Sequence, residues 1–286
     1  MNHADRFDRT SRSDKLPKSS HESAATVAAA SCGIAFMAKA SVPGRAKTRL
    51  VPPLTFDEAA ALNTAFLRDV ADNVLLAASH SAAQAAIAGY AAYGPAKSQD
   101  FFRSTLPGAI GLIEAWQPHF GDCLLHTIRT VLAQGHCSAV VLNSDSPTLP
   151  TALLVETAEV LARPGERAVL GPSHDGGYYL LGLKTAHTRM FADIAWSTEK
   201  VAAQTRERAR EIGLPVHELP VWYDVDDIDG LRRLDAELRG AHPGGVAGGP
   251  HPHHAVQTAK LMNLLRRDHD FGWRMDDITH AAVLRA

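Results

Sequence analysis

Cysteine is scarce in this chain of 286 residues. The three cysteines, Cys32, Cys123 and Cys137, form no C-x-x-C pair and are too few for a disulfide framework. We therefore predict unpaired thiols with structural roles. Unpaired thiols are typical of a reducing compartment, so we expect the protein to work in the cytoplasm.

An excess of one charge and long apolar runs are also missing. The formal net charge is only −2, so the overall charge favours neither nucleic acid nor an anionic membrane as a partner. No apolar run approaches the roughly 20 residues that span a bilayer, and we expect no membrane span. Hydrophobic residues make up 45% of the chain, which is enough for one large core or two small ones.

The two ends differ in composition from the rest. Residues 1–30 are polar and lack apolar periodicity, which predicts a disordered tail. Residues 241–254 are rich in Gly, Pro and His and are typical of a linker. A helical extension over residues 255–286 would follow, with its helix at Val256–Arg267. Residues 31–240 then form the main domain.

Short apolar runs and segments with helical periodicity alternate through that domain. This alternation predicts an α/β fold with a mostly parallel central sheet. Residues 101–106 fit either type. We predict strands over Gly33–Ala38, Ala82–Tyr90, Ala109–Ala115, Ala139–Leu142, Arg167–Leu170, Tyr178–Leu183 and Pro215–Leu219. We predict helices over Phe56–Ala78, Cys123–Ala133, Ala152–Ala162, Glu199–Ile212 and Ile228–Arg239.

An aspartate follows the fourth predicted strand. The run Ala139–Leu142 leads into Asn-Ser-Asp145-Ser-Pro147, and proline cannot continue the strand ladder. Ligands bind at the carboxyl ends of strands in open α/β sheets, and Mg²⁺ favours one or two carboxylates plus substrate phosphates. Asp145 is therefore a candidate metal ligand, and the alternative is a loop aspartate that caps the next helix. We expect Thr148 and Thr151 to cap that helix.

A basic loop follows the first predicted strand. Its sequence, KASVPGRAKTRL over Lys39–Leu50, contains a Pro-Gly turn and no acidic residue. Arginine offers forked donors and lysine a point charge, so such a loop suits a di- or triphosphate. A solvated basic loop is the alternative, and no P-loop motif is present. The candidate phosphate-binding residues are Lys39, Arg45, Lys47 and Arg49.

Two later stretches combine carboxylates with turn residues. Asp175-Gly176-Gly177-Tyr178 permits close approach of a ligand and stacking on a ring, although an Asp-Gly hairpin turn is the alternative. Trp222–Asp229 carries four aspartates in its last six residues. On an extended strand Asp224 and Asp226 would point to one side, where their like charges need a cation or a helix N-terminus.

These stretches, in this order and spacing, resemble a bacterial family of GT-A-fold transferases. The motifs that carry the resemblance are KASVPGRAKTRL, NSDSPTLP, GPSHDGGYYLLGL, WST and DVDD, and it covers Gly33–Leu238. That family is described as glycosyltransferase-like and is associated with radical-SAM, selenium or arsenosugar gene neighbourhoods. The basic loop also resembles that of 2-phospholactate guanylyltransferases, which share the fold and transfer a nucleotidyl group.

The resemblance implies a three-layer GT-A-like domain over residues 31–240 and a role for each matching residue. Asp145 and Asp226 would hold Mg²⁺ or Mn²⁺. Asp175 falls in the implied substrate-side loop, and we take it as the candidate general base. The other implied contacts with the nucleotide or substrate are Lys39, Lys47 and Arg49 in the phosphate loop, Gly176, Gly177 and Tyr178 in the substrate-side loop, and Asp122 in a second loop. Arg45 remains a candidate from the composition of the basic loop.

The resulting prediction is a metal-dependent transferase with a nucleotide-activated donor and a small-molecule acceptor. A nucleotide sugar would make it a glycosyltransferase. A nucleoside triphosphate would make it a nucleotidyltransferase that releases pyrophosphate. A domain that binds nucleotide without catalysis is the third possibility.

Overall fold

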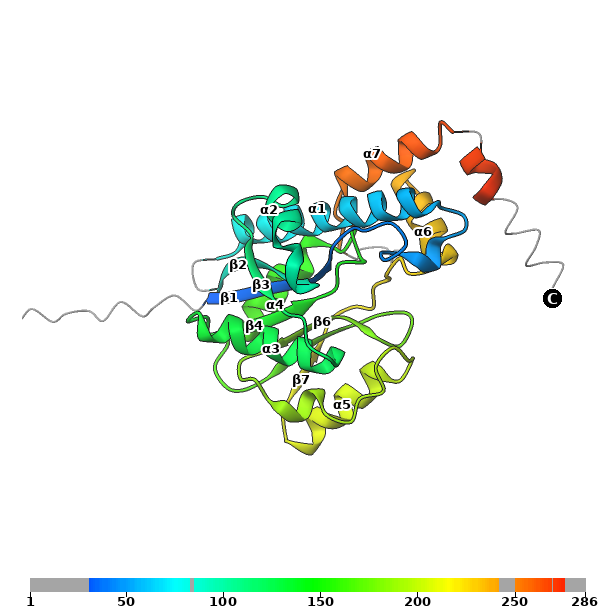
Figure 1. Cartoon of the computed structure of the whole chain (residues 1–286). Helices are drawn as coiled ribbons and strands as arrows, with labels where there is room; N and C mark the ends of the chain where they lie inside the picture. Colours follow the sequence, from blue (N-terminus) through cyan, green and yellow to red (C-terminus); the bar gives the residue numbers. More distant parts are fainter. Residues whose placement is uncertain (1–30, 83–84, 242–249, 269, 276–286) are drawn as a thin grey trace, which may run out of the picture.

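The computed structural model describes residues 31–82, 85–241, 250–268 and 270–275 (Figure 1). The predicted disordered tail at residues 1–30 lies outside the described residues. So do residues 242–249 of the predicted linker and residues 276–286 of the predicted extension.

A seven-stranded sheet forms the centre of the molecule, in the order β3-β2-β1-β4-β6-β5-β7. Only β6 runs antiparallel to its neighbours, β4 and β5, so the prediction of a mostly parallel sheet is confirmed. The strands are β1 (Ser31–Lys39), β2 (Ala86–Gly94), β3 (Gly111–Glu114), β4 (Ser138–Leu142), β5 (Ala168–Pro172), β6 (Tyr178–Leu183) and β7 (Val216–Glu218).

Helices connect the strands and cover both faces of the sheet. Residues 101–106, which the sequence left undecided, fall largely in α2. The second strand lies four residues later than predicted, because the first helix continues to His80. The helices are α1 (Phe56–His80), α2 (Gln99–Thr105), α3 (Phe120–Ala133), α4 (Thr151–Ala162), α5 (Val201–Glu211), α6 (Ile228–Leu238) and α7 (Val256–Leu265), with short 3₁₀ turns η1 (Thr48–Leu50), η3 (Ala96–Ser98) and η4 (Thr188–Phe191). None of the helices in the described ranges combines the length and apolar composition needed to cross a bilayer.

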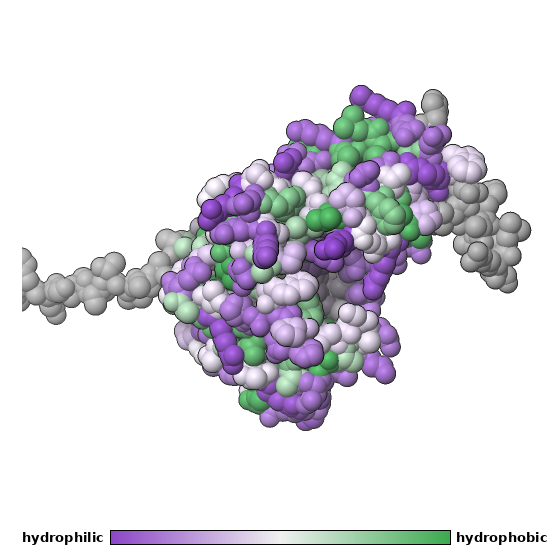
Figure 2. All heavy atoms as spheres, viewed as in Figure 1, coloured by the Kyte–Doolittle hydropathy of each residue, from purple (hydrophilic) through white to green (hydrophobic). Residues whose placement is uncertain are grey.

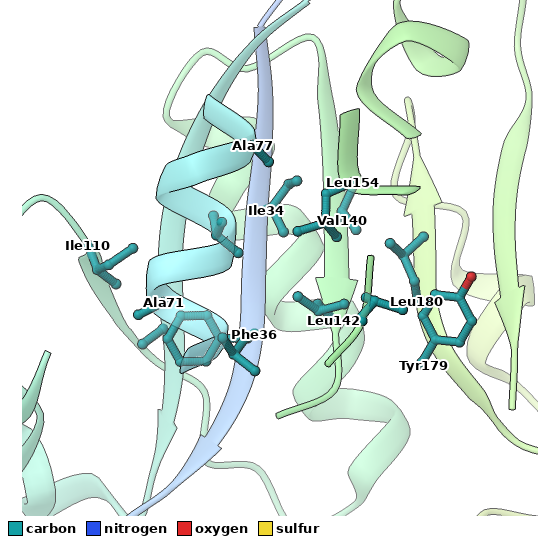
Figure 3. Close-up of a cluster of buried hydrophobic side chains, with 14 of the residues drawn as sticks. Ile34, Phe36, Ala71, Ala77, Ile110, Val140, Leu142, Leu154, Tyr179 and Leu180 are labelled. Carbon is teal, nitrogen blue, oxygen red and sulfur yellow. The ribbon is translucent and has the colours of Figure 1, made fainter. Parts of the chain in front are cut away.

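The alternation of side chains along each strand builds a core on each face of the sheet. Ile34 and Phe36 of β1 and Val140 and Leu142 of β4 point to one face, where α1 and α4 cover them (Figure 3). Ala35 and Val141 point to the other face, toward α3 and η4. The central strands β1 and β4 are therefore buried on both faces, and the molecule has the three layers that the sequence predicts.

A third core joins the carboxyl-terminal segment to the main body. Met262 and Leu265 of α7 pack with Phe66 of α1 and with Val225, which precedes α6. The buried Asp69 carboxylate of α1 accepts the backbone N–H groups of residues 257 and 258, at 2.8 and 2.7 Å. A carboxylate at a helix N-terminus stabilises the helix and satisfies free donors. Helix α7 is thus docked on α1 rather than separate from it.

The predicted capping of the fourth helix is wrong. Pro150 stands at the N-cap position of α4, and no side chain caps it there. Thr148 instead meets the Tyr223 hydroxyl at 3.0 Å, and Thr151 donates to the Asn73 side chain at 2.7 Å. Both hydroxyls therefore form hydrogen bonds with residues distant in the sequence, whereas local spacing had predicted that they cap the helix.

His253, next to Thr148, should make stability depend on acid pH. Burial and then the nearby His254 lower the pKa of His253 to about 4. In the unfolded chain an ordinary histidine has a pKa of about 6.5. Between these values the unfolded state binds more protons, so stability should fall as pH falls through this window. Between pH 7.5 and pH 5 the melting temperature of His253→Gln should therefore fall less than that of the wild type, as measured by calorimetry. The melting temperature of His251→Gln, a substitution at an exposed position, should fall as much as that of the wild type.

Candidate active site

A cavity of about 790 Å³ opens at the carboxyl ends of the central strands. Figure 2 shows this face of the molecule hollowed between the upper elements, α1 and α6, and the lower ones, β6 and α5. The loops after β1 and β4, the β5–β6 turn and the segment before α6 all contribute to its wall. The stretches that the sequence singled out therefore meet in one place, as expected for the carboxyl edge of an α/β sheet.

Asp145 and Asp226 are brought together by backbone contacts. Asp145 follows β4, and its carbonyl accepts the N–H of Val225 at 2.9 Å. The next residue after Asp145 adds a second bond, in which Ser146 Oγ donates to the Tyr223 carbonyl at 2.7 Å. Both bonds join segments about 80 residues apart. They hold the two predicted metal carboxylates beside the same cation, although the residues lie far apart in the chain.

That cation is the ammonium group of Lys47. Its Nζ lies 2.7 Å from Asp145 Oδ1 and 2.9 Å from Asp226 Oδ1, and it donates to the Val225 carbonyl at 2.8 Å. The Lys47 side chain is 6% exposed, against 30% for Asp145 and 43% for Asp226. Burial acts to lower the pKa of Lys47, but the two carboxylates outweigh it and raise this pKa, which keeps the ammonium charged.

The other three residues of the basic loop lie further out on the cavity wall. Lys39, Arg45 and Arg49 are exposed, and all line the cavity. Arg49 is the closest of them to the carboxylates, with Nη1 3.8 Å from Asp226 Oδ2, and its side chain is 71% exposed. These cations have hydrogen-bonding capacity to spare for an anionic ligand, whereas Lys47 already has three acceptors.

Asp175 lies at the tip of the β5–β6 hairpin, so the hairpin reading of this stretch is confirmed. Its Oδ1 accepts the N–H of Gly177 at 2.8 Å. Gly176 has φ +86°, and a Cβ there would lie 2.2 Å from the Glu199 carbonyl oxygen, so only glycine fits. Asp175, Gly177 and Tyr178 line the cavity. Gly176 is not among the lining residues and serves the shape of the turn.

Asp122 does not reach the cavity. It lies in the first turn of α3 and is exposed. Phe120, Cys123 and Leu124 of the same turn line the cavity, and a residue at the intervening position points elsewhere around the helix. The geometry therefore gives Asp122 no contact with a ligand in the cavity.

Sequence reasoning gave no role to two features of the wall: Asp224, noted only beside Asp226, and the aromatic rings other than Trp196, which could line a pocket or fill the core. Asp224 accepts from Ser173 Oγ at 3.1 Å, and burial, followed by the charges of Asp175 and Asp226, raises its pKa to about 6. Aromatic rings also line the cavity: the exposed Trp116 and Phe120, with Trp196 edge-on to Phe120 at 5.4 Å. The position of Trp116, directly after the third strand, was the available signal.

The carboxylate pair fits a divalent cation in chemistry and placement. Its two oxygens already converge on one positive group within 2.9 Å. Among the residues that the structure describes, no three His, Cys, Asp or Glu side chains cluster as a ready-made metal site. Mg²⁺ does not need one, since it is commonly bound by one or two carboxylates together with substrate phosphates and water.

Comparisons with known proteins agree with this architecture. Residues 76–198 match the model of a family described as "Uncharacterized protein conserved in bacteria (DUF2064)". A solved structure of a candidate nucleotide-diphospho-sugar transferase from Desulfovibrio desulfuricans G20 has a TM-score of 0.64 and 26% sequence identity; the match covers 82% of this chain and 97% of that one. The fold is that of the nucleotide-diphospho-sugar transferases. The predicted GT-A-like fold is thereby confirmed.

Two further solved structures are similar in outline only. A cytidylyltransferase from Leptospira borgpetersenii has a TM-score of 0.47 and 11% identity, with 84% of this chain and 95% of that one covered. A CMP:2-keto-3-deoxy-manno-octonic acid synthetase complexed with CTP has a TM-score of 0.46 and 11% identity, with 74% and 99% covered. No curated protein matches the chain. None of the matches concerns gene neighbourhoods, so that association stays a prediction.

Proposed function

We propose that this protein is a metal-dependent transferase that uses a nucleotide sugar as donor. One observation carries the proposal. Asp145 and Asp226, which are 81 positions apart, meet at a single cation at the carboxyl edge of the sheet, beside exposed basic side chains. Paired carboxylates next to cations suit a diphosphate bridged by a divalent metal. The nucleotide-diphospho-sugar transferase fold supports the same substrate class.

Each group at the cavity would then have a distinct role. Asp145 and Asp226 would hold Mg²⁺ or Mn²⁺, which when bound neutralises charge on the donor diphosphate. Arg49, with Lys39 and Arg45 further out, would bind the phosphate oxygens and stabilise the charge that develops on the leaving nucleoside diphosphate.

Asp175 is the candidate general base on the acceptor side. Its Oδ1 is held by Gly177 N–H, which fixes the carboxylate at the cavity wall and leaves Oδ2 to take a proton from an acceptor hydroxyl. The acceptor oxygen would then form the new bond to the sugar carbon as the bond from that carbon to the donor diphosphate breaks. The products are a glycoside and a nucleoside diphosphate.

A nucleotidyltransferase is the second candidate, and the basic wall of the cavity favours it. Besides Lys47, three exposed cations of one loop line the cavity, and a triphosphate carries more negative charge for them to bind than a diphosphate does. In this reaction an acceptor phosphate oxygen attacks the α-phosphorus of a nucleoside triphosphate and pyrophosphate leaves. Assaying released pyrophosphate and released nucleoside diphosphate separates the two reactions, and release of neither under any donor would favour a non-catalytic nucleotide-binding domain.

The proposal is tested by thermal shift with nucleoside triphosphates, diphosphates and nucleotide sugars, each with and without Mn²⁺. A ligand that binds the folded state raises its melting temperature by mass action. We expect stabilisation by at least one nucleotide, and only with the metal present. If no nucleotide stabilises the protein with Mn²⁺, the proposed function is wrong.

Arg49→Ala should weaken binding of nucleoside diphosphate about ten- to a hundredfold, because one charge-assisted contact is worth roughly 1.5–3 kcal/mol. Binding of the plain nucleoside should stay unchanged. Titration calorimetry with both ligands measures the difference. Arg103→Ala, at an exposed residue of α2 that is not among the cavity-lining residues, is the matched control. Equal weakening of nucleoside and diphosphate would contradict a phosphate contact.

A further inference from the structure

The position of Lys47 conflicts with the role that the basic loop was expected to have. Its ammonium is bound at the cavity wall rather than free to meet a phosphate. It lies between the two carboxylates, where a divalent cation would have to lie. All three of its protons have acceptors within 2.9 Å, two on carboxylates and one on the Val225 carbonyl. Lys47 is thus an internal cation that completes the carboxylate pair before any ligand arrives.

An ammonium and a divalent metal cannot share this position. Mg²⁺ lies about 2.1 Å from each carboxylate oxygen, and the ammonium lies 2.7 and 2.9 Å from the same two atoms. Two cations within a few ångströms repel strongly, most of all where little water screens them. A metal can therefore take the position between these two oxygens only when the Lys47 ammonium leaves it, which costs the lysine its two carboxylate partners.

The local backbone is built for such a side-chain position. Lys47 has φ +51° and ψ +37°, the left-handed region that a residue with a Cβ seldom adopts. Residues kept in such conformations cluster at ligand and switch sites, because surrounding structure must hold them there. Leu50 and Leu54, just downstream, are buried in the core shared with α1 and α6, and they anchor the loop.

A movement of the side chain alone would take the ammonium into the cavity. Lysine has four rotatable carbon–carbon bonds and a point charge, so it can exchange one anion for another without movement of the backbone. Lys47 itself lines the cavity, between Arg45 and Arg49 on the same wall. Donor phosphates bound by those arginines would offer the ammonium new anionic partners at the moment when the carboxylates gain the metal.

We propose that Lys47 acts as a resident cation that excludes divalent metal from Asp145 and Asp226 until the phosphates of the donor attract its ammonium away. The inference rests on the proposed function and specifies how its two ligands bind. Metal and nucleotide bind cooperatively, and each binds poorly alone. The coupling is reciprocal, so the metal strengthens nucleotide binding by the same factor by which the nucleotide strengthens metal binding.

Lys47→Met tests this, because methionine keeps an unbranched stem of similar length and removes the charge. The probe is Mn²⁺ alone, with free Mn²⁺ measured by electron paramagnetic resonance in titrations of the protein without nucleotide. We expect the variant to bind Mn²⁺ at least about tenfold more tightly than the wild type, because its two carboxylates have lost their internal cation. Arg49→Met, which removes an exposed cation 3.8 Å from the same pair, should change Mn²⁺ affinity far less.

The wild type provides an independent measurement if the variant folds poorly. Without nucleotide it should bind Mn²⁺ no more tightly than the Asp145→Asn variant does. Tight binding of Mn²⁺ by the nucleotide-free wild type would overturn the inference, and so would equal Mn²⁺ affinities of the wild type and Lys47→Met. Either result leaves the proposed function standing if nucleotide and Mn²⁺ still stabilise the protein together. Failure of that joint stabilisation would instead remove the proposed function.

Discussion

Asp145→Asn should reduce turnover at least about a hundredfold and abolish metal-dependent nucleotide binding, while the folded structure survives. The substitution keeps the shape of the side chain and removes the charge that faces the cation. Loss of a single group that stabilises transition-state charge typically costs 100- to 1,000-fold in turnover. The melting temperature should change little, because the side chain is 30% exposed and one carboxylate still faces Lys47. Turnover is followed as release of nucleoside diphosphate or pyrophosphate.

Asp229→Asn is the matched control for charge. It belongs to the same acidic run as Asp226 and lies in the first turn of α6, but it is 86% exposed and pairs with Arg232, at 3.4 Å. It should retain wild-type turnover. Wild-type activity of Asp145→Asn with Mg²⁺ would show that the carboxylate pair is not the metal site.

Removal of residues 242–286 should lower the melting temperature by about 10 °C or more. Met262, Leu265 and Phe271 are buried against Phe66 and the start of α6, and burial of each such side chain is worth roughly 1.5–3 kcal/mol. A loss of several kcal/mol in a domain of this size corresponds to a shift of that order. The truncation would also leave the Asp69 carboxylate without the two N–H groups that it accepts.

A chain that ends at residue 275 is the control, since it retains α7 and Phe271. Its melting temperature in differential scanning calorimetry should equal that of the full-length protein. If the chain that ends at residue 241 also melts at the full-length temperature, the extension does not stabilise the domain. We expect the extension to stabilise the domain, and we propose that residues 31–240 and the docked extension unfold as one cooperative unit.

Much of the fold is predictable because its signals are local. The apolar runs that form β1 and β4 are buried on both faces of a sheet, and such strands show as continuous hydrophobic segments. Carboxylates that directly follow strands belong to the ligand-binding edge, and this rule was enough to select Asp145. The Asp-Gly-Gly turn was recognisable for the same reason, since turn chemistry depends on adjacent residues.

The details of the site depend on contacts between distant segments, and these have no local signal. The charge of Lys47 indicated phosphate, but its ammonium is held by carboxylates up to 179 positions away. Thr148 had the right spacing for a helix cap, yet its hydroxyl forms hydrogen bonds with the Tyr223 hydroxyl and the Glu237 carboxylate. Asp122 is not among the residues that line the cavity, because a shift of one residue along a helix changes the direction in which a side chain points.

The long separation between Lys47 and Asp226 also affects the order in which the molecule is made. Chains emerge from the ribosome N-terminus first, and contacts between distant residues form late because the intervening loop must close. Strands β1 to β4 can pair before Asp226 is synthesised. Helix α7, which packs in the same core as Leu50 and Val225, is made later still. The contact between Lys47 and Asp226 therefore forms only after residue 226 has been made. A shorter nascent chain contains Lys47 and Asp145 but lacks the second carboxylate of this ion-pair cluster.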